Sequence, residues 1–173
     1  GGGDTAMDCV RTAIRQGADS VVCLYRRDRE NMPGSAREVI HAEAEGVQFD
    51  WLSAPAAILG DAETATGVKV QAMALGAPDA SGRRKPVVLD GEERDLPADM
   101  VVAALGFEPE AFNEIWSAPD LSLNPRGAIR VLKGCRTSLP GVYAGGDAVR
   151  GASLVVWAVK DGQDAAKAIH EDL

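Results

Sequence analysis

An apolar stripe with helical spacing lies near the start of the chain, and a buried-strand pattern follows it. The stripe recurs at i, i+3 and i+4 and predicts a helix over residues 7–16, which Gly17 ends. Its members are Ala6, Cys9, Val10, Ala13 and Ile14. Residues 20–25 are rich in Val and Leu and predict a buried strand. The chain therefore opens with a helix that leads into a strand.

A second helix and strand follow in the same order. Ser35 and Glu38 have the spacing of a capping box and predict a helix over about residues 36–45. Its inward-facing positions are Val39 and Ala42. Residues 47–52 alternate between apolar and polar and predict a strand. The repeat of helix and strand is typical of an α/β fold.

In the middle of the chain, the pattern predicts strands with one face exposed to solvent. Residues 68–75 alternate regularly, and residues 86–89 predict a further strand. Asp90-Gly91 is a hairpin turn signal, whereas residues 55–67 are expected to be a connector and residues 76–85 a turn-rich loop. This part is predicted to form a small antiparallel β excursion.

The last third returns to buried-strand and helix patterns. Residues 99–106 are almost entirely apolar, end in glycine, and predict a buried parallel strand. Residues 128–131 and 141–144 predict short strands, and a long helix is expected over residues 154–172. The apolar stripe of this helix includes Val155, Ala158, Val159, Ala165, Ala166 and Ile169. The fold class predicted from the whole pattern is α/β, with a small antiparallel β excursion.

Composition excludes several classes of protein. The chain has 173 residues, of which 46% are hydrophobic and 25% charged, as in a globular protein of one domain or slightly more. The net charge of −8 argues against a nucleic-acid partner. The three cysteines include no C-x-x-C pair, and an odd count without a disulfide framework is typical of a reducing cytoplasm. No apolar run reaches eighteen residues, so no membrane span is expected.

The first six residues match G-x-G-x-x-A, the glycine-rich turn of Rossmann-like dinucleotide-binding domains, which is the type of α/β domain that we therefore expect. Gly1 permits the tight turn, Gly3 lets the backbone approach a pyrophosphate, and Ala6 lets the helix pack close to its strand. The helix N-terminus offers free N–H groups and a partial positive charge to phosphates. The alternative is an ordinary helix start.

The strand tip after this helix indicates which nucleotide binds. An NAD site places Asp or Glu there, whereas this chain has Arg26 and Arg27. A carboxylate repels a 2′-phosphate, and a guanidinium binds it with paired hydrogen bonds. The arginines therefore favour NADPH, with a solvated strand end as the alternative.

A second stretch with site-like chemistry lies near residue 147. Gly146 and Asp147 follow a short strand, and the long helix begins near Ser153. An acid at a strand tip accepts hydrogen bonds from a sugar-like hydroxyl chain, and the helix N–H groups face an electron-rich ring edge. We find no Ser–His–Asp order and no metal-ligand cluster in the sequence, so we assign no catalytic side chain and no metal site.

Four segments together resemble the small (beta) subunit of bacterial NADPH-dependent glutamate synthase. They read GGGDTAMDCVRTAIRQGA, YRRDRENMPGSAREV, ALGFEPE and GVYAGGDAVRGASLVVWAVKDGQDAA. The resemblance covers nearly the whole chain. It implies a flavoprotein with two dinucleotide-binding folds, in the wider group that includes thioredoxin reductase.

The resemblance also implies roles for individual residues. The NADPH site would use Gly1, Gly2, Gly3, Asp4, Thr5, Ala6, Arg26 and Arg27. Gly106 lies in the segment that crosses back to the FAD domain. Gly146 belongs to the glycine stretch of that domain, and Asp147 would hold the ribityl chain. The amides of Ser153, Leu154 and Val155 would face the flavin ring.

The family's N-terminal region, with cysteines for iron–sulfur clusters and the first FAD glycine turn, is not in this sequence. The resemblance therefore implies a C-terminal fragment. Residues 1–106 would be an NADPH-binding domain without its first strand, and residues 107–173 the return into an incomplete FAD domain. We expect the isolated fragment to be inactive.

In the complete protein, the resemblance implies hydride transfer from NADPH to FAD. Electrons then pass through iron–sulfur centres to the large (alpha) subunit of glutamate synthase. Two alternatives remain open from the residues: a related NADPH-dependent flavoprotein subunit with another electron acceptor, and a non-catalytic nucleotide-binding module.

Overall fold

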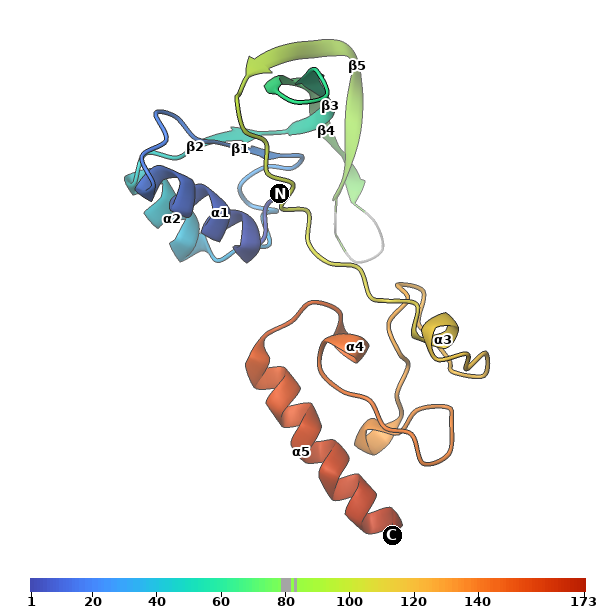
Figure 1. Ribbon diagram of the computed structural model, residues 1–173. Coiled ribbons are helices and arrows are strands. Elements are labelled where there is room, and N and C mark those ends of the chain that lie inside the picture. Colours follow the sequence, from blue (N-terminus) through green and yellow to red (C-terminus); the bar gives the residue numbers. More distant parts are fainter. Residues whose placement is uncertain (79–81, 83) are drawn as a thin grey trace. The chain divides into compact units, whose positions relative to one another are not determined.

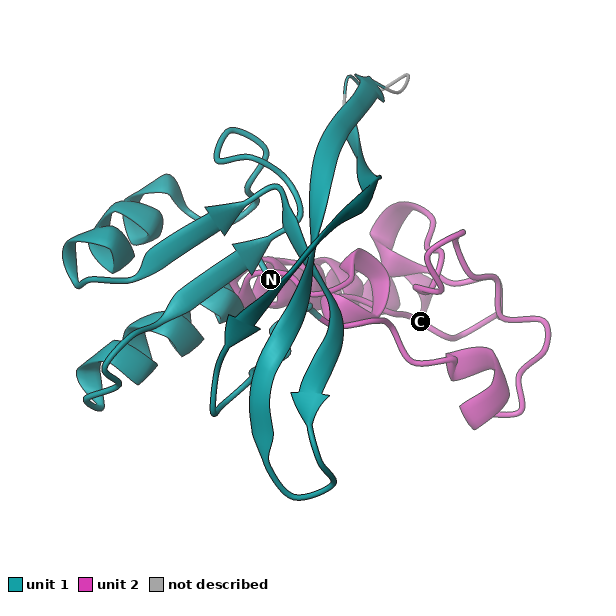
Figure 2. Ribbon diagram, turned by 90° about the horizontal axis from the view of Figure 1, so that it is seen from above, with its two compact units in different colours: residues 1–106 teal, residues 107–173 magenta. Residues whose placement is uncertain are grey.

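The chain forms two compact units, Gly1–Gly106 and Phe107–Leu173, which Figure 2 colours separately. The structure is a computed structural model that describes residues 1–78, 82 and 84–173. No helix among the described residues is long and apolar enough to cross a bilayer.

The first unit begins with two helix–strand pairs. The elements are α1 (Asp4–Arg15), β1 (Val22–Tyr25), α2 (Ala36–Ala44) and β2 (Gln48–Trp51). The two strands pair in parallel, with Val22 opposite Gln48 and Tyr25 opposite Trp51. The two helices lie side by side (Figure 1). The sequence predictions for all four elements are confirmed, with bounds within three residues of those observed; the largest difference is the start of α1, predicted at residue 7 and observed at Asp4.

A small apolar core joins α1, β1 and α2. Its buried members are Ala6, Met7, Cys23, Val39, Ala42 and Val47. The inward positions predicted for α2 are therefore confirmed. Met7 lies outside the predicted stripe of α1, yet it is only 1% exposed. Phe49 and Trp51 of β2 pack on this core and stack on each other, with ring centroids 4.9 Å apart.

The start of α2 was predicted correctly, but for the wrong reason. Ser35 is the N-cap residue, yet its side chain makes no capping hydrogen bond. The expected partner, Glu38, pairs instead with Arg11 of α1. A charged guanidinium is a stronger donor than a backbone amide, so the carboxylate of Glu38 binds Arg11 and does not cap the helix.

Strands β3 (Ser53–Gly60), β4 (Ala65–Pro78) and β5 (Arg84–Pro97) form an antiparallel sheet in that order. The antiparallel excursion is confirmed, but two of its boundaries were wrong. The predicted connector over residues 55–67 holds most of β3, and its turn forms where Asp61 accepts hydrogen bonds from the amides of Glu63 and Thr64.

The second wrong boundary is the hairpin signal at Asp90-Gly91, which lies inside β5. Gly91 has φ of 79°, in the left-handed region, and the pairing with β4 shifts register nearby. The glycine therefore permits an irregularity in a long strand rather than a turn. The predicted loop over residues 76–85 lies partly outside the described residues.

The apolar run at residues 99–106 is not a strand in this structure. Met100 is 76% exposed and Leu105 is 77% exposed. Ala104 alone packs against the core of the first unit. An apolar run indicates a preference for burial, but no strand among the described residues pairs with it, so the ladder that defines a strand does not form.

The second unit consists mainly of short elements and one long helix. They are α3 (Phe112–Ile115), the 3₁₀ turn η1 (Lys133–Cys135), α4 (Asp147–Arg150) and α5 (Val155–Asp172). Helix α5 confirms the predicted long helix. The strands predicted at residues 128–131 and 141–144 are only isolated bridges, Leu123 with Ile129 and Arg136 with Tyr143.

The burial pattern of α5 differs from the predicted apolar stripe. Val155 and Val159 are exposed among the described residues, whereas Asp161 and Ala168 are buried. Hydrophobic periodicity predicted the helix correctly but gave the wrong buried face. A carboxylate occupies the buried position because it has strong partners in the preceding turn, as described below.

Candidate functional site

The glycine-rich turn leads directly into α1. Gly3 is the N-cap residue, and its carbonyl accepts hydrogen bonds from the amides of Ala6 at 3.0 Å and Met7 at 3.2 Å. The first amides of the helix have no intrahelical acceptor, as at any helix start. Thr5 is exposed in this first turn. The turn therefore presents N–H groups and the positive end of a helix dipole, which is the arrangement that binds phosphate.

The three glycines of the turn differ in what surrounds them. A side chain on Gly1 would lie 1.7 Å from the carbonyl oxygen of Ala104, and one on Gly2 would lie 2.4 Å from the ring of Tyr25. No described atom lies within 4 Å of the corresponding position on Gly3. Gly1 and Gly2 are thus required by packing, whereas Gly3 leaves open space beside the helix start.

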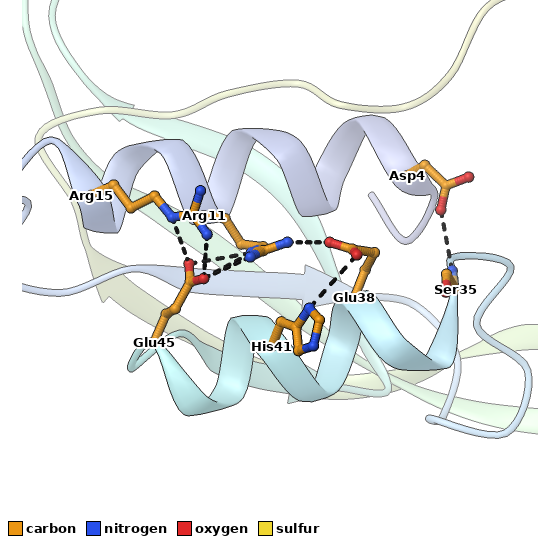
Figure 3. A network of polar contacts seen from close by, with 7 residues as sticks. All are labelled: Asp4, Arg11, Arg15, Ser35, Glu38, His41 and Glu45. Carbon is orange, nitrogen blue, oxygen red and sulfur yellow. Dashed lines mark hydrogen bonds and ion pairs between the residues drawn. The ribbon is translucent and has the colours of Figure 1, made fainter.

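Asp4 connects the turn to the second helix. Its carboxylate accepts a hydrogen bond from the amide of Ser35 at 3.1 Å (Figure 3). The carbonyl of Gly2 accepts one from the amide of Gly34 at 2.9 Å. Two contacts therefore fix the loop before α2 to the glycine turn.

The two predicted arginines have different environments at the end of β1. Arg26 is exposed, but Arg27 is only 6% exposed. The Nε atom of Arg27 is enclosed and has no hydrogen-bond partner among the described residues. A buried donor without a partner is destabilising, and an acceptor atom from a ligand or from water at this position would remove that cost.

The structure brings the glycine turn and the arginine strand tip together. Tyr25 packs its ring against Gly2 and donates a hydrogen bond from its hydroxyl to the carbonyl of Asn31 at 2.9 Å. Arg26 and Arg27 follow this tyrosine directly in the chain. The predicted phosphate-binding turn and the predicted specificity residues therefore belong to one local arrangement.

Ion pairs hold α1 against α2 behind the turn (Figure 3). Arg11 binds both Glu38 and Glu45, and Arg15 also binds Glu45. Hydrogen bonds from Arg11 and then Arg15 lower the pKa of Glu45 to about 2. His41 lies 3.7 Å from Glu38 at the edge of this network, which supports a structural role for the histidine. The network fixes the two helices whose first turns meet at Asp4 and Ser35.

The second predicted stretch forms a tight turn in the second unit. Gly146 has φ of 63° and ψ of −144°, a conformation that side chains do not readily adopt, and it precedes α4. Asp147 is exposed and lines a hollow of about 180 Å³ with Phe107, Pro109 and Ala152. The carboxylate is therefore available to a ligand.

The remaining predicted residues lie near the start of α5 and at the end of the first unit. Leu154 is the N-cap residue of α5 in an extended conformation, Val155 is the first helical residue, and Ser153 is exposed just before them. Ala152, which lines the hollow with Asp147, is the neighbour of Ser153. Gly106 is the last residue of the first unit and has φ of 94°.

The sequence analysis did not identify Asp161 and Arg150 of the second unit as residues of the candidate site. Asp161 is 6% exposed and accepts hydrogen bonds from the amide of Gly146 at 2.9 Å and from two nitrogens of Arg150 at 2.7 Å each. The bonds from Arg150, and then from Gly146, lower the pKa of Asp161 to about 2. Periodicity gave no signal for Asp161, because this acid lies outside the predicted apolar stripe and its partners come from the turn before α5.

Comparison with known proteins agrees with this architecture. Residues 1–162 match the pyridine nucleotide-disulphide oxidoreductase family. The fold also resembles the crystal structure of T. acidophilum thioredoxin reductase, with a TM-score of 0.75 and 24% identity over 99% of this chain and 50% of that one. The expected Rossmann-like fold of the flavoprotein type is confirmed.

The curated relatives are closer in sequence and considerably longer. A putative glutamate synthase [NADPH] small chain of Cereibacter sphaeroides is 62% identical over 98% of this chain and 41% of its own length. The glutamate synthase [NADPH] small chain of Azospirillum brasilense is 57% identical over 98% of this chain and 35% of its own length. This chain thus spans less than half of each relative. Since the family match extends over residues 1–162, the chain belongs to the pyridine nucleotide-disulphide oxidoreductase family.

Proposed function

We propose that this chain is the NADPH-binding part of a flavoprotein oxidoreductase of the glutamate synthase small-chain type. The observation that carries the proposal is the combination of an open glycine turn at the start of α1 with a buried Arg27 at the end of β1, whose Nε has no hydrogen-bond partner among the described residues. The names of the two curated relatives specify NADPH and glutamate synthase, which supports the same assignment.

The residues of the first unit fit NADPH. The open side of Gly3 admits a pyrophosphate next to the N–H groups of α1, where the helix dipole favours negative charge. Arg27 offers an Nε donor that no described residue accepts from, and Arg26 offers an exposed guanidinium for a 2′-phosphate. NADH lacks this phosphate and would leave the Arg27 donor unpaired. The site therefore favours NADPH over NADH.

The residues of the second unit fit one portion of FAD. Asp147 is exposed beside a hollow and suits a chain of sugar-like hydroxyl groups. The first amides of α5, from Leu154 onward, suit an electron-rich ring edge. When bound, the two cofactors supply the hydride and electron-transfer chemistry. The residues of this chain bind and orient them.

The rest of the electron path follows from the same assignment. Electrons would leave through iron–sulfur centres held outside this chain and reach a large (alpha) subunit that forms glutamate. The designation of the relatives as small chains supports a larger partner. The three free cysteines of this chain suit the reducing cytoplasm, where we place the protein.

Spectroscopy on the native gene product tests the proposal. We expect flavin and iron–sulfur absorption bands, bleaching of the flavin by NADPH, and glutamate formation when the large subunit is added. A colourless product that binds NADPH would indicate a nucleotide-binding module instead. Bleaching by NADPH without glutamate formation would indicate a related subunit with another electron acceptor.

A further inference from the structure

Asp161 holds both ends of a short helix with one carboxylate. At the start of α4, the amide of Gly146 donates to Oδ2 of Asp161 at 2.9 Å. At the end of α4, Arg150 donates from Nε to the same oxygen and from Nη2 to Oδ1, each at 2.7 Å. The guanidinium of Arg150 also lies over the ring of Trp157, 4.9 Å from its centroid. We call Asp161, Arg150 and the Gly146 amide the α4 clamp.

Helix α5 packs directly on the turn that the α4 clamp holds. A side chain on Gly145 would lie 2.7 Å from Cβ of Asp161, and one on Gly146 would lie 3.1 Å from Cβ of Ala158. Close approach of α5 is therefore possible only because both turn residues are glycines. Glycine is also the most flexible residue, so this turn needs an external contact to hold a single conformation.

The position of this turn sets the direction of Asp147. Asp147 follows Gly146 immediately and is the first residue of α4. The carboxylate of Asp161 is enclosed and has charge-assisted partners, so it is a rigid anchor rather than a solvated side chain. Asp147 itself makes no side-chain hydrogen bond among the described residues that would orient it in another way.

We propose that Asp161 is a positioning residue for the flavin site: by holding both ends of α4, it fixes Asp147 toward the hydroxyl chain of FAD. This inference rests on the proposed function, because it requires that Asp147 contacts FAD. Asp161 does not touch the flavin but acts through Asp147. The two residues should therefore be energetically coupled in flavin binding.

A double-mutant cycle in the native gene product tests the coupling. The variants are Asp161→Asn, Asp147→Ala and the double variant, with FAD dissociation constants measured by flavin fluorescence. We expect each single variant to bind FAD about tenfold more weakly, the effect of one lost charge-assisted hydrogen bond. We expect the double variant to bind no more than about twofold more weakly than Asp147→Ala alone.

Two further variants separate positioning from general destabilisation. Asp164→Asn removes an acid of the same helix whose ion pair, within the described part of the chain, is with exposed Lys160, and it should change FAD affinity less than twofold. Arg150→Gln keeps the Asp161–Gly146 bond and should weaken FAD binding by a smaller factor than Asp161→Asn. It remains informative if Asp161→Asn does not fold. Hydrogen exchange of the Gly146 amide should accelerate in Asp161→Asn.

The outcomes distinguish this inference from the proposed function. A wild-type product without flavin overturns the proposed function, and the positioning role with it. A flavin-containing wild type whose Asp161→Asn variant keeps full FAD affinity overturns only the positioning role. Multiplicative losses in the double variant also overturn it, because they would show that the two residues act independently.

Discussion

Replacing Arg27 by Met is expected to stabilise the protein and weaken its affinity for NADPH. The wild-type residue is 6% exposed and has an Nε donor with no partner among the described residues. An unsatisfied buried donor costs about 1–3 kcal/mol, and Met retains most of the apolar stem. Because the unsatisfied group is a single N–H, we take the lower end and expect a gain of about 1 kcal/mol in the free energy of unfolding.

The effect on binding has the opposite sign. Hydrogen bonds to a charged group contribute about 1.5–3 kcal/mol, so loss of the guanidinium should raise the NADPH dissociation constant about 10- to 150-fold. NADH carries no 2′-phosphate, so its affinity should change little. Urea unfolding gives the stability, and titration with each nucleotide gives the affinities.

Arg26→Met is the matched control. Arg26 is exposed, so its removal should weaken NADPH binding without a gain in stability. The reasoning about Arg27 is refuted if Arg27→Met loses stability while NADPH binding persists. An equal loss of affinity for NADPH and NADH would also refute it, since it would show that Arg27 does not recognise the 2′-phosphate.

Other substitutions test the turn, the core and the ion pairs. Gly3→Val fills open space and should abolish measurable NADPH binding with little change in thermal unfolding, whereas Gly2→Ala should clash with the Tyr25 ring and destabilise by about 1–3 kcal/mol. Met7→Ala should lower the urea-unfolding free energy by about 2–5 kcal/mol, and a smaller loss would mean that its site collapses. Glu45 has its pKa lowered from 4.5 to about 2, so its stabilisation is present above pH 4.5 and lost as the pH falls toward 2. Glu45→Gln should flatten acid unfolding in that window, and an unchanged profile would contradict the pairing.

Local patterns predicted the first half of the fold well. The glycine turn, the strand at Val22–Tyr25 and the helix at Ala36–Ala44 all follow from spacing that acts within a few residues. The inward positions Val39 and Ala42 follow from the same periodicity. These features were predictable because neighbouring residues determine them.

Features that depend on distant partners were not predictable. The carboxylate of Glu38 accepts a hydrogen bond from Arg11, which lies 27 residues earlier in the chain, and does not form the predicted capping box. Residues 99–106 have the composition of a strand, but pairing requires a neighbouring strand that composition does not specify. The burial of Asp161 depends on Arg150 and on the turn at Gly146. The site residues themselves stay predictions, because their roles depend on ligands.

Calorimetric titration of this chain with NADPH and with NADH measures the nucleotide preference that the proposed site requires. We expect one NADPH per chain, bound at least about tenfold more tightly than NADH, because one charge-assisted contact contributes about that factor. Affinity for NADPH should fall as salt rises, since arginine–phosphate attraction is screened. Equal affinities for the two nucleotides, or no binding of either, would show that the glycine turn and the arginines do not form an NADPH-selective site.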